Sequence, residues 1–378
     1  MANKKIIIFL TLLIFTVFFS FPDQKRFRAR ELGIRIGVLN TGKFNSITDV
    51  KRVKVGHTTI IKKDNIRTGV TVIIPHENNI FQNKIPAAIY VANGFGKLTG
   101  YTQVEELGNI ETPIVLTNTL SVWTAADALI DYTLRFNVKT GSVNPVVGET
   151  NDGWLNDIRN RSINKQHILK ALESAKSGEV EEGSVGAGTG TLCLGFKGGI
   201  GTSSRILPKS SGMYTVGVLV QSNFGGILRI DGIPVGIELN NYYFKRKLDS
   251  KPRGSCMIIV ATDAPLRSRN LKRLAKRAML GFGKIGGISS NGSGDYVIAF
   301  STHLDVKNKP DINSLTVKQE VLPNNVMSPL FLAVIEATEE AILNSLLKAT
   351  TIKGKDGHIS TPLPIEKLKV ILKKYNKI

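Results

Sequence analysis

Apolar residues in this chain gather in short runs bounded by glycine, proline or polar residues. Runs of this length, rich in β-branched residues, predict buried strands. The clearest cover residues 68–75, 213–221, 256–261 and 296–301. Residues 33–38, and the alternating valines within 47–57, predict further strands near the start of the chain.

Other segments repeat their apolar residues at helical spacing. They cover residues 121–134, 166–175, 270–281, 328–349 and 365–375. Predicted helices and strands are mixed along the chain, with no internal repeat and no composition break. A single layered α/β or α+β domain is therefore the simplest architecture.

Two segments carry neither pattern. Residues 183–205 contain eight glycines and no plausible helix. Residues 226–253 are irregular and become increasingly basic toward their end. The second segment is typical of an exposed linker that tolerates a backbone break.

The beginning of the chain has the pattern of an export signal. Lys4 and Lys5 precede an apolar stretch over residues 6–19, which is short for a membrane span. We assign residues 1–25 to a signal peptide and 26–378 to one mature domain, and expect a periplasmic or extracellular protein without stable membrane association. No small-x-small cleavage site follows, so an uncleaved membrane anchor stays open.

The formal net charge of +20 raises the question of a polyanionic partner. One basic cluster has helical spacing, and it consists of Arg267, Arg269, Lys272, Arg273, Lys276 and Arg277. It could bind phosphates or a membrane surface. No aromatic residues interleave with it. We therefore favour a solvated helix face and expect no nucleic-acid partner.

Several common chemistries lack their motifs. The Gly-rich stretch 186–190 has neither a dinucleotide fingerprint nor a phosphate-loop ending, and the G-x-G-x-x-G match at 281–286 closes a predicted helix. No G-x-S-x-G or HExxH occurs, and the five histidines are scattered. We expect no metal site, whereas a Ser-His-Asp triad stays open. Cys193 and Cys256 belong to no CxxC motif and are either buried thiols or a disulfide.

The remaining chemistry lies in polar residues at strand ends and in glycine loops: Lys197, Asn223, Ser255, Ser293 and Asp295. At Gly254-Ser255 a basic loop changes at once into a buried strand. The ordinary interpretation is a serine that starts a strand after a loop. A self-cleaving amide hydrolase also places a hydroxyl at this position.

Collinear stretches decide between the two interpretations. They include residues 30–34, 47–57, 68–72, 112–119, 149–157, 186–190, 196–205, 254–265, 291–295 and 327–340. In this order they resemble the DmpA-type L-aminopeptidase/D-amino-acid esterase family, which also contains β-aminopeptidases and nylon-oligomer hydrolases. The resemblance covers nearly the whole mature chain.

The resemblance implies a four-layer αββα sandwich similar to N-terminal-nucleophile hydrolases. It implies cleavage between Gly254 and Ser255 into an α-subunit (26–254) and a β-subunit (255–378), which form a homo-oligomer of α/β heterodimers. It also implies no metal and no organic cofactor. Ser255 is the implied nucleophile, with its own α-amine as base. An amine of this kind has a pKa of about 7.7–8.0, so part of it is neutral near pH 7.

The resemblance assigns roles to the other residues. Asn223 matches the oxyanion-hole position, and Ser293 and Asp295 match positions that relay protons and orient the amine. Lys197 matches a lysine near the nucleophile in the nylon-hydrolase branch. Trp154 stands where relatives often carry a tyrosine as second oxyanion donor, so that donor, or the substrate range, is expected to differ.

We therefore expect an exported, self-processing serine hydrolase that releases N-terminal residues from peptides, amides or esters. An endo-acting amidase on oligoamides is the nearest alternative. A non-catalytic binding protein that retains the fold is an alternative from a different class.

Overall fold

The computed structural model describes residues 25–243, 245, 253–303, 316 and 319–378. The predicted signal peptide, apart from its last residue, and part of the basic linker (246–252) lie outside the described residues. No described helix is long and apolar enough to cross a membrane.

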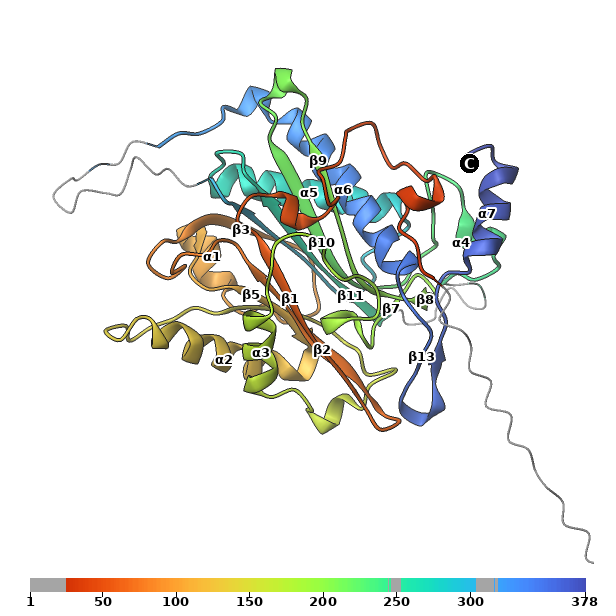
Figure 1. Ribbon diagram of the computed structural model, residues 1–378, viewed down its shortest axis with the longest axis horizontal. Helices are drawn as coiled ribbons and strands as arrows, with labels where there is room; N and C mark the ends of the chain where they lie inside the picture. Colours follow the sequence, from red (N-terminus) through yellow and green to blue (C-terminus); the bar gives the residue numbers. More distant parts are fainter. Residues whose placement is uncertain (1–24, 244, 246–252, 304–315, 317–318) are drawn as a thin grey trace, which may run out of the picture.

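Two sheets form the centre of the molecule (Figure 1). The six-stranded sheet has the order β4 (Asn109–Ile110), β3 (Ile85–Gly94), β12 (Gly292–Ser301), β11 (Arg253–Thr262), β10 (Thr215–Asn223) and β9 (Gly199–Ile206). The four-stranded sheet has the order β1 (Lys54–Lys62), β2 (Ile66–Ile74), β5 (Ile114–Asn118) and β6 (Val146–Thr150). The pairs β11–β12 and β5–β6 are parallel. Short strands pair β7 (Leu192–Cys193) with β8 (Phe196–Lys197) and β13 (Ile352–Lys353) with β14 (Ile359–Ser360).

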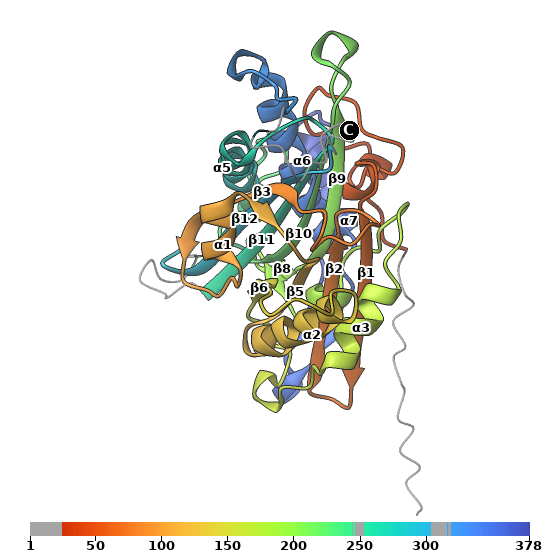
Figure 2. The same cartoon turned by 90° about the vertical axis from the view of Figure 1, so that its left-hand side faces the viewer.

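Helices cover both outer faces. In Figures 1 and 2, α5 (Ser268–Lys284) and α6 (Ser328–Leu347) lie on one side of the two sheets, and α2 (Val122–Arg135) and α3 (Lys165–Glu173) lie on the other. The remaining helices are α1 (Tyr101–Leu107), α4 (Val235–Glu238) and α7 (Ile365–Lys374).

Three apolar clusters separate four layers. The first lies between the six-stranded sheet and α5–α6, and it includes Val218, Ile258 and Ala341. The second fills the space between the sheets, where Met257 and Ile259 meet Leu116. The third joins the four-stranded sheet to α2 and α3. Because β11 alternates its side chains between the first two clusters, both faces of this strand are buried.

Most predicted elements are present with slightly shifted ends. The strands predicted over 68–75, 213–221, 256–261 and 296–301 are β2, β10, β11 and β12. The five predicted helices are α2, α3, α5, α6 and α7. The strand β9 lies within the glycine-rich segment for which no element was predicted.

The prediction for the first strands was right only over residues 54–57. Residues 33–38 form no strand, and β1 begins only at Lys54. Residues Ile47–Asp49 form a 3-10 helix, because Ser46 and Asp49 make a capping box. The apolar residues Ile47, Val50 and Val53 repeat every third position and enter the cluster between the sheets.

The linker prediction was also wrong over its first part. Leu228, Ile230, Ile233 and Val235 are buried in the cluster below α5 and α6. Residues 226–241 are therefore anchored to the core by these side chains and do not form an exposed linker.

The basic helix is α5. Its charges are engaged within the protein: Arg277 lies 3.9 Å from the centre of the Phe331 ring, and Lys272 pairs with Glu105. Leu271, Leu274 and Ala275 are buried. These contacts agree with a surface helix whose opposite face packs on the core.

Candidate active site

Ser255 lies at the start of β11, a central strand of the six-stranded sheet. It is opposite Asn223 on antiparallel β10 and in register with Gly294 on parallel β12. Only 4% of its surface is exposed. A strand with neighbours on both sides fixes the Ser255 backbone, which places its hydroxyl with little freedom.

Gly254 lies where a side chain does not fit. A Cβ added there would lie 2.9 Å from Phe224 Cα and 3.0 Å from Asn223 O. Both neighbours are backbone atoms, which cannot turn aside as a flexible side chain can. The β10–β11 contact therefore requires glycine immediately before Ser255.

The Asn223 side chain is oriented by its hydrogen bonds. Its Oδ1 accepts from Leu192 N at 3.0 Å, so Nδ2 must face the other way. Nδ2 donates to Asn151 O at 3.1 Å and lies 3.4 Å from Ser255 Oγ. The structure thus brings together Asn223 and Ser255, with an amide donor directed at the hydroxyl.

Ser293 and Asp295 form a buried pair on β12. Ser293 Oγ donates to Asp295 Oδ1 at 2.7 Å. Ser293 is in register with Gly254 and Asp295 with Cys256, so the pair flanks the Gly254–Ser255 junction. Asn93 fixes the turn before β12, since its Nδ2 donates to Ser290 O at 2.9 Å.

Burial raises the pKa of the Asp295 carboxyl, and the hydrogen bond from Ser293 opposes that shift. Its second oxygen, Oδ2, is buried without a hydrogen-bond partner within the described ranges. An unpaired buried carboxylate oxygen is costly, and it is an acceptor ready for a further donor.

Lys197 is fully buried on β8. Its Nζ donates to Gly188 O at 2.9 Å and Gly198 O at 2.8 Å. Burial lowers the pKa of the ammonium to about 7, against the opposing influence of Cys193 and Asp152. A lysine without a direct carboxylate contact in such a place can exchange a proton near neutral pH.

The two cysteines, Cys193 and Cys256, are both free and buried. Burial raises the pKa of the Cys193 thiol to about 12. Neither is a thiolate at neutral pH, so neither is an activated nucleophile.

The end of β6 and the loop after it contribute two buried acids for which the sequence analysis predicted no role. Glu149 is 4% exposed, and it accepts hydrogen bonds from Lys97 N at 3.0 Å and from Thr119 Oγ1. Gly96 separates it from Gly294: a Cβ added at Gly96 would lie 3.2 Å from both Glu149 Oε1 and Gly294 Cα. A buried carboxylate therefore lies close to the strand position beside Ser255.

Burial raises the pKa of Glu149, and it raises that of Asp152 to about 7. The Asp152 carboxyl accepts from Asn156 Nδ2 at 2.9 Å. These acids lie at the end of β6 and just after it, within residues 149–157, one of the stretches that carry the family resemblance. Polar residues at a strand end were the signal that could have identified them.

Trp154 lies in the same loop, and its indole contacts His358. Its indole is 52% exposed and stacks on His358, with ring centroids 3.7 Å apart and planes 3° apart. The member of this loop that touches Asn223 is Asn151, through its main-chain oxygen. A role for Trp154 in substrate binding stays a prediction.

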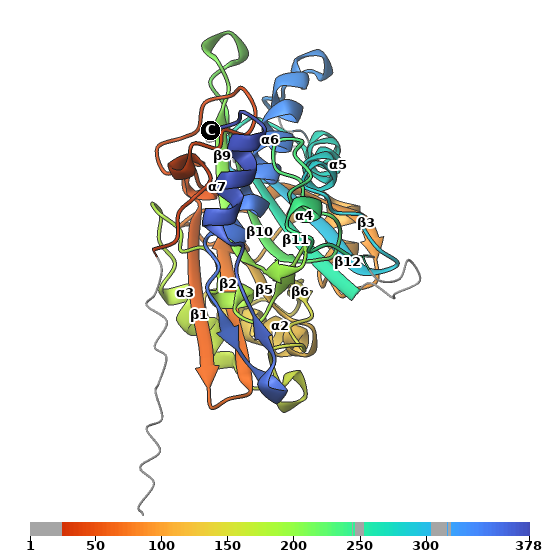
Figure 3. The same ribbon diagram turned by 90° about the vertical axis from the view of Figure 1, so that its right-hand side faces the viewer.

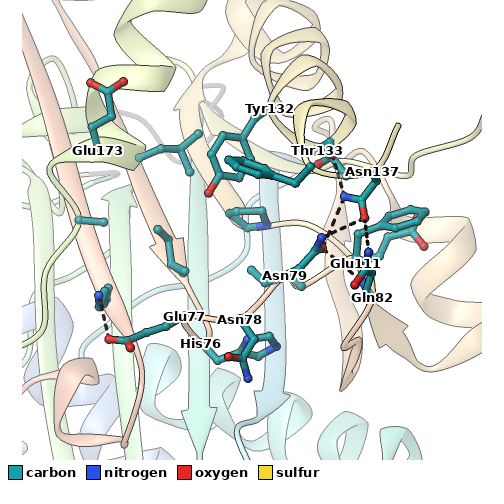
Figure 4. Close-up of a pocket in the computed structure, with 18 residues that line it drawn as sticks. His76, Glu77, Asn78, Asn79, Gln82, Glu111, Tyr132, Thr133, Asn137 and Glu173 are labelled. Atoms are coloured by element: carbon teal, nitrogen blue, oxygen red, sulfur yellow. Dashed lines mark hydrogen bonds and ion pairs between the residues drawn. The ribbon is translucent and has the colours of Figure 1, made fainter. Parts of the chain in front are cut away.

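A cavity of about 620 Å³ lies elsewhere, between the end of α2 and residues 76–82 (Figure 4). Asn79, Gln82 and Asn137 are joined by hydrogen bonds along its wall, and Glu77 pairs with Lys54. None of the predicted catalytic residues lines it. At Ser255, by contrast, a hydroxyl, an amide donor and buried acids lie close together.

Among the residues that the structure describes, no group of three or more His, Cys, Asp or Glu side chains is arranged to hold a metal ion. The groups around Ser255 suit acyl transfer: a hydroxyl, a donor for an oxyanion and buried titratable groups.

Known proteins share this architecture. The model of Peptidase family S58 matches residues 45–360. The beta-peptidyl aminopeptidase BapA of Sphingosinicella microcystinivorans is 39% identical over 372 residues, which is 93% of each chain. The crystal structure of the PH0078 protein from Pyrococcus horikoshii OT3 has a TM-score of 0.86 and 49% identity, covering 93% of this chain and 100% of that one.

A third relative connects the fold with a described enzyme. The L-aminopeptidase D-Ala-esterase/amidase of Ochrobactrum anthropi, a variant of the Ntn hydrolase fold, has a TM-score of 0.81 and 33% identity over 93% of this chain and 99% of its own. The predicted layered fold and the predicted family are confirmed. The chain is a peptidase of the aminopeptidase type and belongs to Peptidase family S58.

Proposed function

We propose that this chain cleaves its own Gly254–Ser255 bond and then acts as an aminopeptidase with N-terminal Ser255 as nucleophile. The observation that carries the proposal is the Asn223 amide, which is fixed by Leu192 N and directed at Ser255 Oγ from 3.4 Å. The required Gly254 and the buried Ser293–Asp295 pair support it.

In the processing step, Ser255 Oγ attacks the Gly254 carbonyl carbon. The C–N bond breaks, the Ser255 nitrogen takes up a proton as an amine, and Gly254 becomes an ester on Oγ. Water then hydrolyses this ester, which releases the Gly254 carboxylate and restores the hydroxyl. The Asn223 amide stabilises the oxyanion that forms in each addition.

In the mature enzyme the Ser255 α-amine takes the proton of Oγ as the hydroxyl attacks the substrate carbonyl. The amine returns the proton to the leaving amine, and water completes hydrolysis of the acyl-enzyme. The free Oδ2 of Asp295 is the acceptor that we assign to the α-amine, with Ser293 holding the carboxylate in place. Because the pKa of Lys197 is lowered to about 7, its amine is charged below neutral pH and neutral above it.

We assign recognition of the substrate's N-terminal ammonium to Glu149. The carboxylate is buried and lies one glycine away from the strand position beside Ser255. Its ion pair with Lys97 is long, with Nζ 4.0 Å from Oε1, so a substrate ammonium would give this buried carboxylate a further cationic partner. Glu149→Gln is then expected to raise KM for free-amine substrates far more than it lowers kcat.

The proposed substrates are short peptides, amides or esters with a free N-terminus. Relatives are named for β-peptidyl and for L-amino and D-Ala substrates, so a panel of β-, L- and D-aminoacyl p-nitroanilides covers the range. Cleavage of an N-blocked oligoamide would favour the endo-acting alternative.

A denaturing gel with mass spectrometry of the purified protein tests the proposal. We expect two fragments that divide between residues 254 and 255. Ser255→Ala should remain one chain and lack activity. An intact wild-type chain would support the non-catalytic alternative, and activity in Ser255→Ala would overturn the mechanism.

We also propose export directed by residues 1–25 and an oligomer of α/β heterodimers. The start of the chain, with Lys4 and Lys5 before an apolar stretch, supports export. The large exposed apolar side chains of Trp123, Phe136 and Val138, on and after α2, support oligomer contacts in this part of the surface. Fractionation of cells and light scattering of the purified protein test these two points.

A further inference from the structure

The hairpin formed by β13 and β14, residues 352–360, follows α6 and precedes α7 in the chain, and it lies beside the ends of β1 and β2 (Figure 3). We name it the C-terminal hairpin. It follows Ser255 in the sequence, whereas its contacts at residues 67 and 154–155 precede Gly254. After cleavage at that bond, the hairpin would belong to the β-subunit. It would contact residues 67 and 154–155 of the α-subunit.

Arg67 makes the first connection. It is 8% exposed, and its Nε donates to Lys353 O in the hairpin at 2.7 Å. Its Nη1 donates to Ile66 O at 2.7 Å, which holds the guanidinium rigidly. Its main-chain N donates to Asn156 Oδ1 at 3.1 Å. Arg67 thus contacts the hairpin and the loop after β6 at the same time.

The hairpin also contacts that loop directly. Lys355 N donates to Leu155 O at 2.8 Å. His358 Nδ1 lies 2.8 Å from Trp154 O, and because a carbonyl only accepts, Nδ1 carries the hydrogen. The rings of His358 and Trp154 are stacked. Gly354 approaches so closely that an added Cβ would lie 2.1 Å from Leu155 O.

The loop transmits these contacts to the active site. Leu155 N and Asn156 N both donate to Asp152 O, at 3.2 and 3.0 Å, so residues 152–156 form one closed turn. Next to this turn, Asn151 O accepts from Asn223 Nδ2. Immediately after the hairpin, Thr361 O accepts from Lys197 N at 2.8 Å. The hairpin segment is therefore connected to Asn223 through this loop, and the residue that follows it contacts Lys197 directly.

We propose that the C-terminal hairpin is a positioning element for the oxyanion donor, with His358 as its positioning residue. By holding the Trp154 carbonyl, His358 fixes the loop whose Asn151 oxygen keeps the Asn223 amide directed at Ser255. This inference rests on the proposed role of Asn223. Looser positioning weakens stabilisation of the transition state more than binding of the substrate, so kcat falls and KM does not.

Three replacements of His358 separate its two contacts. His358→Ala removes both, and we expect kcat of the processed enzyme to fall about 5- to 20-fold with KM within about twofold. His358→Asn keeps an N–H donor near the position of Nδ1 and should restore kcat to within about threefold of wild type. His358→Phe keeps a stacking ring without a donor and should remain near the alanine variant. Ile359→Ala, on an exposed hairpin residue, is the matched control.

Unchanged kcat in His358→Ala would overturn the inference. So would a rise in KM alone, which indicates a direct substrate contact, or an asparagine variant no better than alanine. Thermal unfolding of each variant checks that the fold is kept. Processing of the wild type and of Ser255→Ala is measured separately. If the wild type is not processed, the proposed function is rejected. If the wild type is processed normally and His358→Ala is unaffected, only the role of the hairpin is rejected.

Discussion

Asn223 Nδ2 and Ser255 Oγ lie 3.4 Å apart across the antiparallel pair β10–β11. The distance is longer than an ideal hydrogen bond, and the amide also donates to Asn151 O. An amide in this position can donate to an oxygen held against Ser255 without first moving. This preorganisation is what electrostatic stabilisation of an oxyanion requires.

Replacing Asn223 should therefore affect chemistry far more than binding. We expect Asn223→Ala to lower kcat by about 10²–10³-fold and to slow self-cleavage, because one oxyanion donor is lost. Asn223→Asp, which keeps the acceptor for Leu192 N but has no donor, should be equally impaired. Steady-state kinetics measure kcat and KM of each variant. The control is Asn83→Ala, which removes an amide that donates to Asn79 O far from the site. Activity of Asn223→Asp near wild type would remove the donor from the mechanism.

Gly254→Ala tests the requirement for glycine at the junction. The added Cβ would meet the backbone of Phe224 and Asn223 at 2.9 and 3.0 Å, so the strand must shift. We expect self-cleavage to slow by about tenfold, since overpacking of this kind costs about 1–3 kcal/mol. The time course of precursor loss on a denaturing gel measures it. Gly141→Ala, with open space around it, should be processed like wild type.

The buried ion network around Arg205 predicts a large effect on stability. The guanidinium is fully buried and pairs with Glu336 at 3.0 Å and Glu340 at 2.8 Å. Arg205→Met leaves two buried carboxylates without this partner, and we expect the free energy of unfolding to fall by about 3–5 kcal/mol. Urea unfolding of the uncleaved Ser255→Ala chain measures it. Removal of the exposed Lys369–Glu366 pair should cost no more than about 1 kcal/mol.

The lowered pKa of Lys197 predicts that the free energy of unfolding depends on pH. Its folded pKa is lowered to about 7 from 10.5, so the unfolded state binds more protons between these values. Stability should therefore rise from pH 7 toward pH 10, with a slope of up to about 1.4 kcal/mol per pH unit from this group. The difference in this slope between Ser255→Ala and Ser255→Ala/Lys197→Met isolates the contribution of Lys197. Equal slopes for the two chains would show that Lys197 titrates normally.

The sequence alone determined many of the core elements, although β3, β5, β6 and β9 were not predicted. Long apolar runs identify β2, β10, β11 and β12, and helical spacing identifies α2, α3, α5, α6 and α7, because local period reflects which faces are buried. One of its errors lies where a local hydrogen bond overrides the pattern. The capping box of Ser46 and Asp49 bends the chain into a 3-10 helix despite neighbouring valines.

The sequence also placed Gly254 and Ser255 at a loop-to-strand junction, and collinear motifs indicated the family. It could not show that Asn223 lies opposite Ser255, because 32 residues separate them and only the β10–β11 register joins them. It could not show that Trp154 faces His358, which lies 204 residues away. Periodicity reports the burial of each residue, whereas partners across a sheet follow from strand order and register. The tertiary structure alone decided these two pairings, of Asn223 with Ser255 and of Trp154 with His358.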